Sequence, residues 1–134
     1  MANSGLSAAN LVTPWLNTLR PAGAAFGPIA GPYIQLHTGE PGPSGTSAVS
    51  VGSTTRLLVT QGASAGGSAL ALTGGPYTWT DAATSESITN LTAWSASTVG
   101  TFYYSVLLTT PQPWVATNTF TLNTLTFALT PQAA

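Results

Sequence analysis

Charged side chains are scarce in this sequence. Only 4% of its 134 residues are charged, against about 25% in an average soluble domain, and lysine is absent. The charged residues are Arg20, Glu40, Arg56, Asp81 and Glu86, and His37 is the single histidine. A free monomer normally stays soluble through mixed charge and a net charge well away from zero, whereas this chain has a net charge of −1. We therefore expect a protein that packs against copies of itself or against another partner.

Other absences exclude whole classes of site. Without cysteine there is no disulfide framework and no thiolate metal site, and a single histidine excludes an ordinary zinc site. A basic footprint for nucleic acid is missing. No apolar run approaches the roughly 20 residues that span a bilayer, and the amino terminus lacks the pattern of a secretion signal. We expect no metal, no cofactor, no nucleic-acid partner and no membrane association.

The sequence offers no convincing catalytic group. Its three carboxylates include Asp81 and Glu86, which flank a turn where solvated acidic residues are usual. Serines are plentiful, but none lies in a strand–turn–helix nucleophile elbow, and no glycine-rich phosphate loop is followed by lysine. We therefore predict a protein that is not an enzyme, with no catalytic residue and no small-molecule substrate.

The first 32 residues are expected to form an arm with a short helix and a connector. Apolar residues recur at spacings of three and four from position 8 to position 19, which is the helical period. Pro14 interrupts this pattern, so either the helix starts late with Thr13 as N-cap, or a weak turn precedes it. Arg20-Pro21 should end the helix, and residues 21–32 form an irregular connector rich in proline and glycine.

Residues 33–134 are expected to form the second unit, a β domain. Short runs of β-branched, aromatic and alternating residues predict strands at 33–38, 56–61, 69–73, 77–80, 87–95, 101–109, 119–123 and 124–130. Less regular apolar spacing within 87–95 indicates a bulge. Many short strands at such intervals are typical of an antiparallel β-sandwich or a jelly-roll-like domain.

Two polar side chains have competing interpretations. His37 ends a predicted strand, and we favour ring nitrogens bonded to the neighbouring loop backbone over a pH-sensitive contact. Arg56 is expected to pair with one of the three carboxylates, either within the chain or between subunits.

The aromatic residues could form a sugar-binding platform, although aromatics at strand period are more often core. Trp114 stands between Pro113 and Val115 in an expected loop, so we predict that it is exposed as a partner contact. The candidate interface residues are Trp15, His37, Glu40, Arg56 and Trp114. We further expect residues 6–32 and the loop 39–46 to contact other subunits or a capsid.

A motif after the first predicted strand resembles a known family. The strand ends in Leu-His-Thr-Gly-Glu-Pro-Gly at 36–42, Thr-Thr-Arg follows at 54–56, and Leu-Thr-Ala-Trp-Ser at 91–95. Across residues 6–130, and most strongly at 33–46, the chain resembles small virion proteins of tailed phages, especially phages of actinobacteria. Members share a strand ending Leu-His-Thr-Gly-Asp/Glu-Pro-Gly and a tryptophan preceded by Gly-Leu, where this chain has Thr92-Ala93.

The resemblance implies a structural protein of the virion. Its members are described as head decoration, minor capsid or minor tail proteins. We predict a capsid decoration protein on the phage head surface that forms homo-oligomers and binds the major capsid protein. The alternatives are a minor tail protein and a carbohydrate-binding or receptor-binding module.

Overall fold

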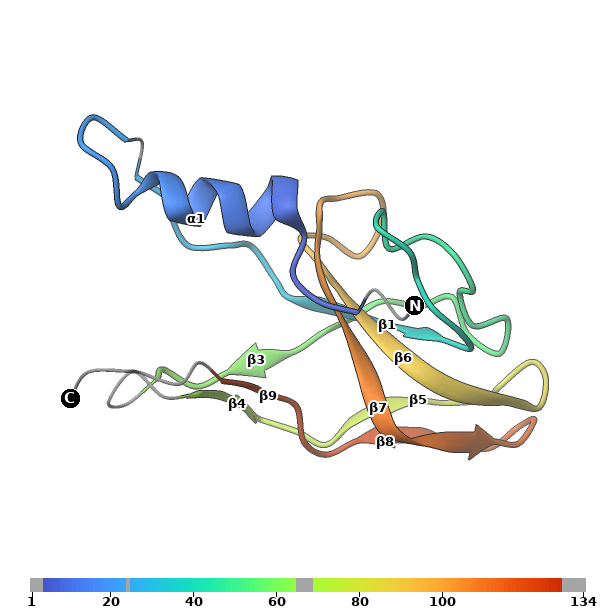
Figure 1. Ribbon diagram of the computed structural model, residues 1–134. Coiled ribbons are helices and arrows are strands. Elements are labelled where there is room, and N and C mark those ends of the chain that lie inside the picture. The colour runs from blue at the N-terminus through green and yellow to red at the C-terminus, as the bar shows by residue number, and fades with distance from the viewer. Residues whose placement is uncertain (1–3, 24, 65–68, 129–134) are drawn as a thin grey trace.

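The computed structural model describes residues 4–23, 25–64 and 69–128. It shows a mainly β, antiparallel protein with one short helical segment near its N-terminus (Figure 1), as the sequence predicts. The helical segment comprises η1 (Ala8–Val12) and α1 (Thr13–Asn17). The strands are β1 (Tyr33–His37), β2 (Leu57–Leu58), β3 (Thr60–Gln61), β4 (Ala69–Thr73), β5 (Tyr77–Trp79), β6 (Glu86–Trp94), β7 (Phe102–Trp114), β8 (Phe120–Leu122) and β9 (Thr126–Ala128).

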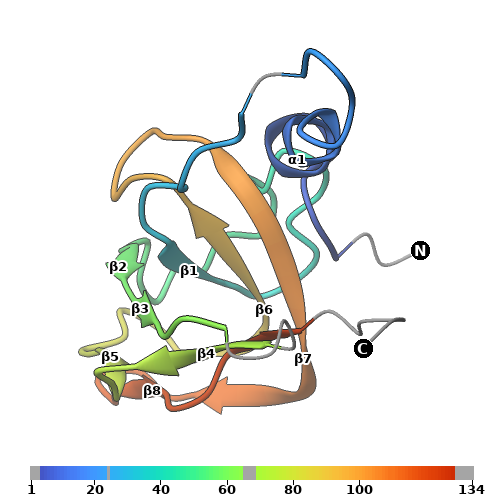
Figure 2. The same ribbon diagram turned by 90° about the vertical axis from the view of Figure 1, so that its left-hand side faces the viewer.

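The strands form two layers. One layer is a four-stranded sheet in the order β2-β1-β6-β7, and the other combines the sheet β3-β4-β9 with the pair β5-β8. Figure 2 shows the two layers facing each other, with the helical segment outside both. This arrangement is consistent with the predicted β-sandwich. Each layer presents apolar side chains to the other because side chains alternate between the two faces of a strand.

The helical segment begins before Pro14, which supports the second of the two expected starts. Ser7 is its N-cap: the Ser7 hydroxyl accepts from the Asn10 amide, and the amides of Leu11 and Val12 both donate to the Ser7 carbonyl. This wide first turn precedes Pro14, which lies in the first turn of α1, where a missing N–H is tolerated. Among the described residues, no helix is long and apolar enough to cross a membrane.

The expected irregularity in the sixth strand is confirmed as a bulge between β6 and β7. Asn90 faces Leu107 and Ile88 faces Gln112, so residues 108–111 of β7 have one residue, Thr89, opposite them. The extra residues bend β7, which runs from one layer to the other in Figure 2. The predicted strand 56–61 is split at Val59, whose amide donates to Pro32 instead of a strand partner. The end of the predicted strand 124–130 lies outside the described residues.

The core lies between the layers and is rich in aromatic residues. Phe120 stands edge-on to two tryptophans, with ring centroids 5.9 Å from Trp79 and 6.0 Å from Trp114. Such edge-to-face pairs add to the free energy gained by burying the rings. The core's fully buried aliphatic residues are Ile34, Leu36, Val59, Ile88, Leu91 and Ala93.

Candidate assembly surface

The segment before β1, which we call the arm (residues 4–23 and 25–32), is attached to β7 at its base. Residues 5–7 pair with β7: the Ser7 amide donates to Tyr103 over 2.6 Å, and the Ser105 amide donates to Gly5 over 2.9 Å. The Asn10 side chain also donates to the Phe102 carbonyl over 2.9 Å. Beyond this base the helical segment stands away from the two layers (Figure 1). The fold therefore fixes the base of the arm and leaves its outer part projecting.

The outer part of the arm exposes large apolar side chains. None of the side chains in residues 8–17, all of which the structure describes, is buried. Trp15, Leu16 and Leu19 are 43%, 53% and 76% exposed. Trp15 and Leu16 lie in α1, and Leu19 follows in the turn after it, where the Leu19 amide donates to the Leu16 carbonyl over 3.1 Å. Several large exposed apolar side chains in one short segment are typical of an interaction site.

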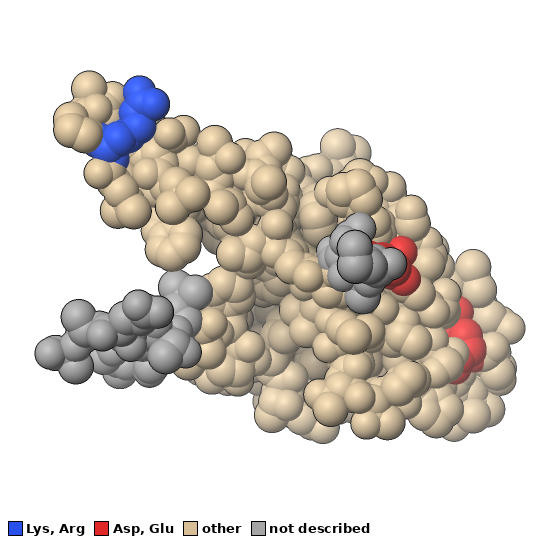
Figure 3. All heavy atoms as spheres, in the orientation of Figure 1, with Lys and Arg blue, Asp and Glu red and all other residues tan. Residues whose placement is uncertain are grey.

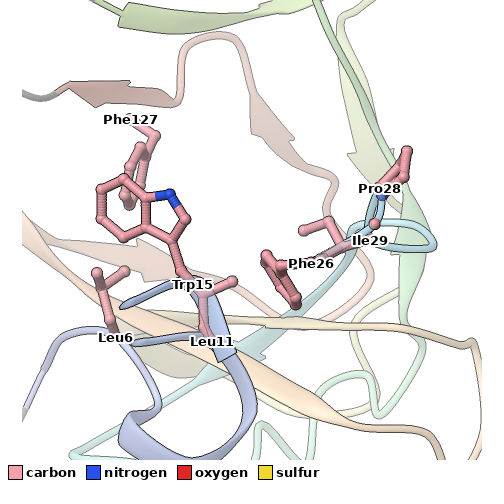
Figure 4. A pocket seen from close by; sticks show the side chains of 8 residues that line it. Leu6, Leu11, Trp15, Phe26, Pro28, Ile29 and Phe127 are labelled. Atoms are coloured by element: carbon pink, nitrogen blue, oxygen red, sulfur yellow. The ribbon is translucent and has the colours of Figure 1, made fainter. Parts of the chain in front are cut away.

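An apolar pocket opens under the arm, between it and β9. Figure 4 shows Trp15 and Leu11 from the helical segment, Phe26 and Ile29 from the connector and Phe127 from β9 around it. Its volume is about 380 Å³. Nearby, the Tyr104 ring lies 5.8 Å from Phe127, and burial raises the pKa of Tyr104 to about 12. The pocket continues the apolar surface of the arm towards the sandwich.

Three loops form a compact closed end of the sandwich, residues 50–53, 81–86 and 115–118. Glu86 holds the first loop, since its carboxylate accepts from the Ser50 hydroxyl and from the amides of Val51 and Gly52. The amides of Ala82, Ala83 and Thr117 bond the loops to one another. Val51, Val115 and Asp81 are exposed on this end. The closed end thus combines exposed apolar side chains with negative charge.

The two ends differ in charge. In Figure 3 basic atoms lie at the tip of the arm, and acidic atoms lie on the opposite side of the molecule. Arg20 is the arginine of the arm, and it is exposed. Positive and negative charges are therefore separated in the molecule, although its net charge is only −1.

His37 is buried and bonded through both ring nitrogens. Nδ1 lies 2.8 Å from the Ser47 carbonyl oxygen, and Nε2 lies 2.8 Å from Thr92 Oγ1. Because a carbonyl only accepts, Nδ1 carries the proton, and the Thr92 hydroxyl donates to Nε2. The Thr92 oxygen in turn accepts from the Trp94 indole N–H over 2.8 Å. The favoured interpretation, in which His37 fixes the turn through the loop backbone, holds for Nδ1.

Burial lowers the pKa of His37, because an imidazolium loses its hydration there, and the nearby charge of Arg56 acts in the same direction. The hydrogen bond to Ser47 opposes this shift. Neutral His37 therefore fastens the loop 38–50 to the sheet, and the Thr38 amide and the Ser50 amide add bonds to Ala48 and Leu36. A residue so enclosed is placed inside the subunit and cannot itself touch a partner.

Arg56 binds an aromatic ring and backbone oxygens rather than Asp81 or Glu86. Its guanidinium carbon lies 3.7 Å from the ring centroid of Trp94, which is cation–π geometry. Nε donates to the Gln35 side chain over 3.1 Å, and Nη1 donates to the carbonyls of Val99 and Ala96. Within the described part of the chain, the loop 95–101 offers these carbonyl acceptors to Arg56, and the predicted pairing with a carboxylate of another subunit stays a prediction.

Trp114 is not exposed, which corrects the expectation from its position between Pro113 and Val115. It is 2% exposed at the end of β7, where its indole N–H donates to the Asn118 carbonyl over 2.9 Å. Strand β7 lies at the edge of its sheet, and an edge strand tolerates prolines. Trp79 and Trp94 are buried as well, so these tryptophans belong to the core and form no sugar-binding platform.

The remaining candidates lie at the surface. Trp15 lines the pocket and is partly exposed, and Glu40 is half-buried in the loop 39–46. In that loop Pro41 and Gly45 are buried, while Pro43, Ser44 and Thr46 are exposed. The structure thus places Trp15, a candidate named from the sequence, beside a pocket and near exposed Leu16 and Leu19, which the list of candidates did not include. The helical spacing of Trp15, Leu16 and Leu19 was the signal that could have found it.

Comparison with protein families places the chain in a family of phage proteins. The family model of the Podophage GP4 fiber I protein gp80 matches residues 8–130, which include the arm and both layers. The chain belongs to this family, and it is accordingly a phage structural protein. A comparison with curated proteins finds no match to the chain.

Proposed function

We propose that this chain is a subunit of a phage tail fibre that acts by binding other protein subunits and not by catalysis. The observation that carries the proposal is the match to a fibre protein family over residues 8–130. The arm supports it, because a projecting segment with exposed Trp15, Leu16 and Leu19 is suited to protein contact. Copies of the same chain are the proposed partners.

The binding energy would come from covering the apolar arm. Burial of apolar surface contributes about 25 cal/mol per Å². When many copies assemble, each further contact is made at a high effective concentration, so weak contacts suffice for a stable fibre. Low charge serves this function, since copies of a nearly neutral chain pack closely without mutual repulsion.

The sequence analysis predicted decoration of the head and gave a minor tail protein as an alternative. We now prefer the tail. The expected contact with the major capsid protein belongs to head decoration and stays a prediction. Receptor binding through sugars is not included, because Trp79, Trp94 and Trp114 are buried. The family description names a fibre, and this word supports the tail over the head.

Cryo-electron microscopy of the intact particle, with gold-labelled antibody against this chain, tests the proposal. We expect density of this fold and label in a fibre attached to the tail. Regular density over the head lattice would refute the fibre assignment and support decoration. Particles without label at either place would refute a virion role altogether, provided that a labelled denatured sample shows that the antibody works.

A further inference from the structure

We infer that the arm is one half of a head-to-tail contact whose other half is the closed end of a second copy of this chain. The inference rests on the proposed function and deepens it by naming the partner and both surfaces. Its basis is the juxtaposition of apolar and charged side chains at each end of the molecule. The arm exposes a positive charge, and the closed end exposes a negative charge.

The arm presents an apolar patch beside a positive charge. Trp15, Leu16 and Leu19 are exposed on it, and Arg20 follows directly in the sequence. The other arginine, Arg56, is held over Trp94 and bonded to Gln35. Arg20 is therefore the arginine that is available to a partner.

The closed end presents apolar side chains beside a negative charge. Val51 and Val115 are exposed on neighbouring loops. Asp81 is exposed in the loop that connects them, whereas Glu86 binds the amides of Val51 and Gly52. Asp81 thus provides the accessible carboxylate, and Glu86 keeps Val51 in its outward position.

The charges at the two ends favour a head-to-tail contact between copies over a symmetric one. A symmetric contact between two arms would bring two copies of Arg20 together, and like charges in contact are destabilising. The arm carries exposed Arg20 and the closed end carries exposed Asp81, and Figure 1 shows the arm and these loops at opposite ends of the molecule. One copy cannot satisfy both surfaces by itself. A contact between the arm of one copy and the closed end of the next is heterologous, and it repeats to give a filament or a closed ring.

Charge exchange tests the pairing in the full-length chain by sedimentation velocity at low ionic strength. Wild-type protein should associate with rising concentration. The single variants Arg20→Glu and Asp81→Lys should each weaken association roughly twofold to thirtyfold, since one exposed pair changes from attraction to repulsion. Mixing the two variants, or combining both changes in one chain, should restore association. Asp81→Asn should weaken association to an intermediate extent. Asparagine also tolerates the φ of 54° found at this position, so the change removes the charge without backbone strain.

A matched pair of leucine variants distinguishes association through the arm from non-specific association through any exposed apolar side chain. Leu16 and Leu107 are 53% and 55% exposed, but only Leu16 lies on the arm. Leu16→Gln should weaken association several-fold, while Leu107→Gln should leave it unchanged, with circular dichroism confirming the fold of both. Equal effects of the two changes would overturn the inference.

Three other results would also overturn it: a wild-type monomer at all concentrations, a symmetric dimer as the largest species, or no restoration in the charge-exchanged mixture. The imaging of the particle is independent of these results. A fibre location without self-association would refute this inference alone, and self-association with a head location would refute the fibre assignment alone.

Discussion

The hydrogen-bonded position of His37 predicts that the protein loses stability below neutral pH. The folded state lowers the pKa of His37 from its usual 6.5, so below that value the unfolded chain binds more protons than the folded one. Stability is therefore fully present above pH 6.5 and falls as the pH decreases below it. Because His37 is the single histidine, no other side chain of the chain has an ordinary pKa between the carboxylates and pH 7.5.

The size of this effect follows from linkage. The largest loss that linkage allows between pH 7.5 and 5.5 is about 1.4 kcal/mol, the free energy that the unfolded state gains when a histidine with the usual pKa of 6.5 is protonated. For a domain of this size this corresponds to a decrease in Tm of about 4–6 °C. Protonation would place a hydrogen on Nε2, where the Thr92 hydroxyl now donates, so the chain from Trp94 to Ser47 must rearrange.

Thermal unfolding, followed by tryptophan fluorescence at pH 7.5, 6.5 and 5.5, measures this decrease. The control is His37→Asn, whose amide nitrogen can take the place of Nδ1 as donor to the Ser47 carbonyl but does not titrate. At pH 7.5 we expect the variant to have a lower Tm than the wild type. Between pH 7.5 and 5.5 we expect the Tm of the variant to stay almost constant. A wild-type Tm that is constant over this range, or an equal decrease in the variant, would refute the assignment of a neutral His37.

Three further predictions concern the loop and the core. Gly45→Ala should cost about 2–4 kcal/mol and Gly42→Ala about 1 kcal/mol in urea unfolding, because both have φ near 70° but only at Gly45 would the new Cβ lie 2.4 Å from the Phe102 ring; equal costs would contradict this packing. Thr92→Val should cost about 2–5 kcal/mol, since it leaves the Trp94 N–H and His37 Nε2 without the shared hydroxyl, while Thr92→Ser should cost much less. Trp114→Ala should cost about 3–5 kcal/mol and Trp15→Ala less than about 1 kcal/mol, and the reverse order would refute the placement of these two side chains.

Strand positions could be predicted because they follow from local sequence. Thr78 and Thr121 alternate with the inward-facing Trp79, Phe120 and Leu122, and this two-residue period is visible without a structure. The bulge opposite Thr89 was visible as well, as an irregular apolar spacing. In both cases the physical cause lies within a few residues of the feature.

The pairing of side chains could not be predicted because its causes lie far apart in the sequence. Arg56 binds Trp94 and the carbonyl of Val99, more than thirty-five positions away, and a search for carboxylates missed an aromatic partner. Trp114 was assigned to a loop because prolines flank it, although the edge position of β7 accommodates them. The apolar stripe of the arm was predicted, but a stripe does not reveal whether another part of the chain covers it.

The distribution of the few charges links the fold to assembly. Arg56 and Glu86 are used inside the subunit, where each organises a loop through backbone groups. Arg20 and Asp81 remain exposed, the former on the arm and the latter on the closed end. The sequence as a whole is rich in threonine and serine, whose hydroxyls hydrogen-bond to water or to a neighbour and carry no charge. In the proposed head-to-tail contact, the charges at the two ends would set the direction in which copies stack.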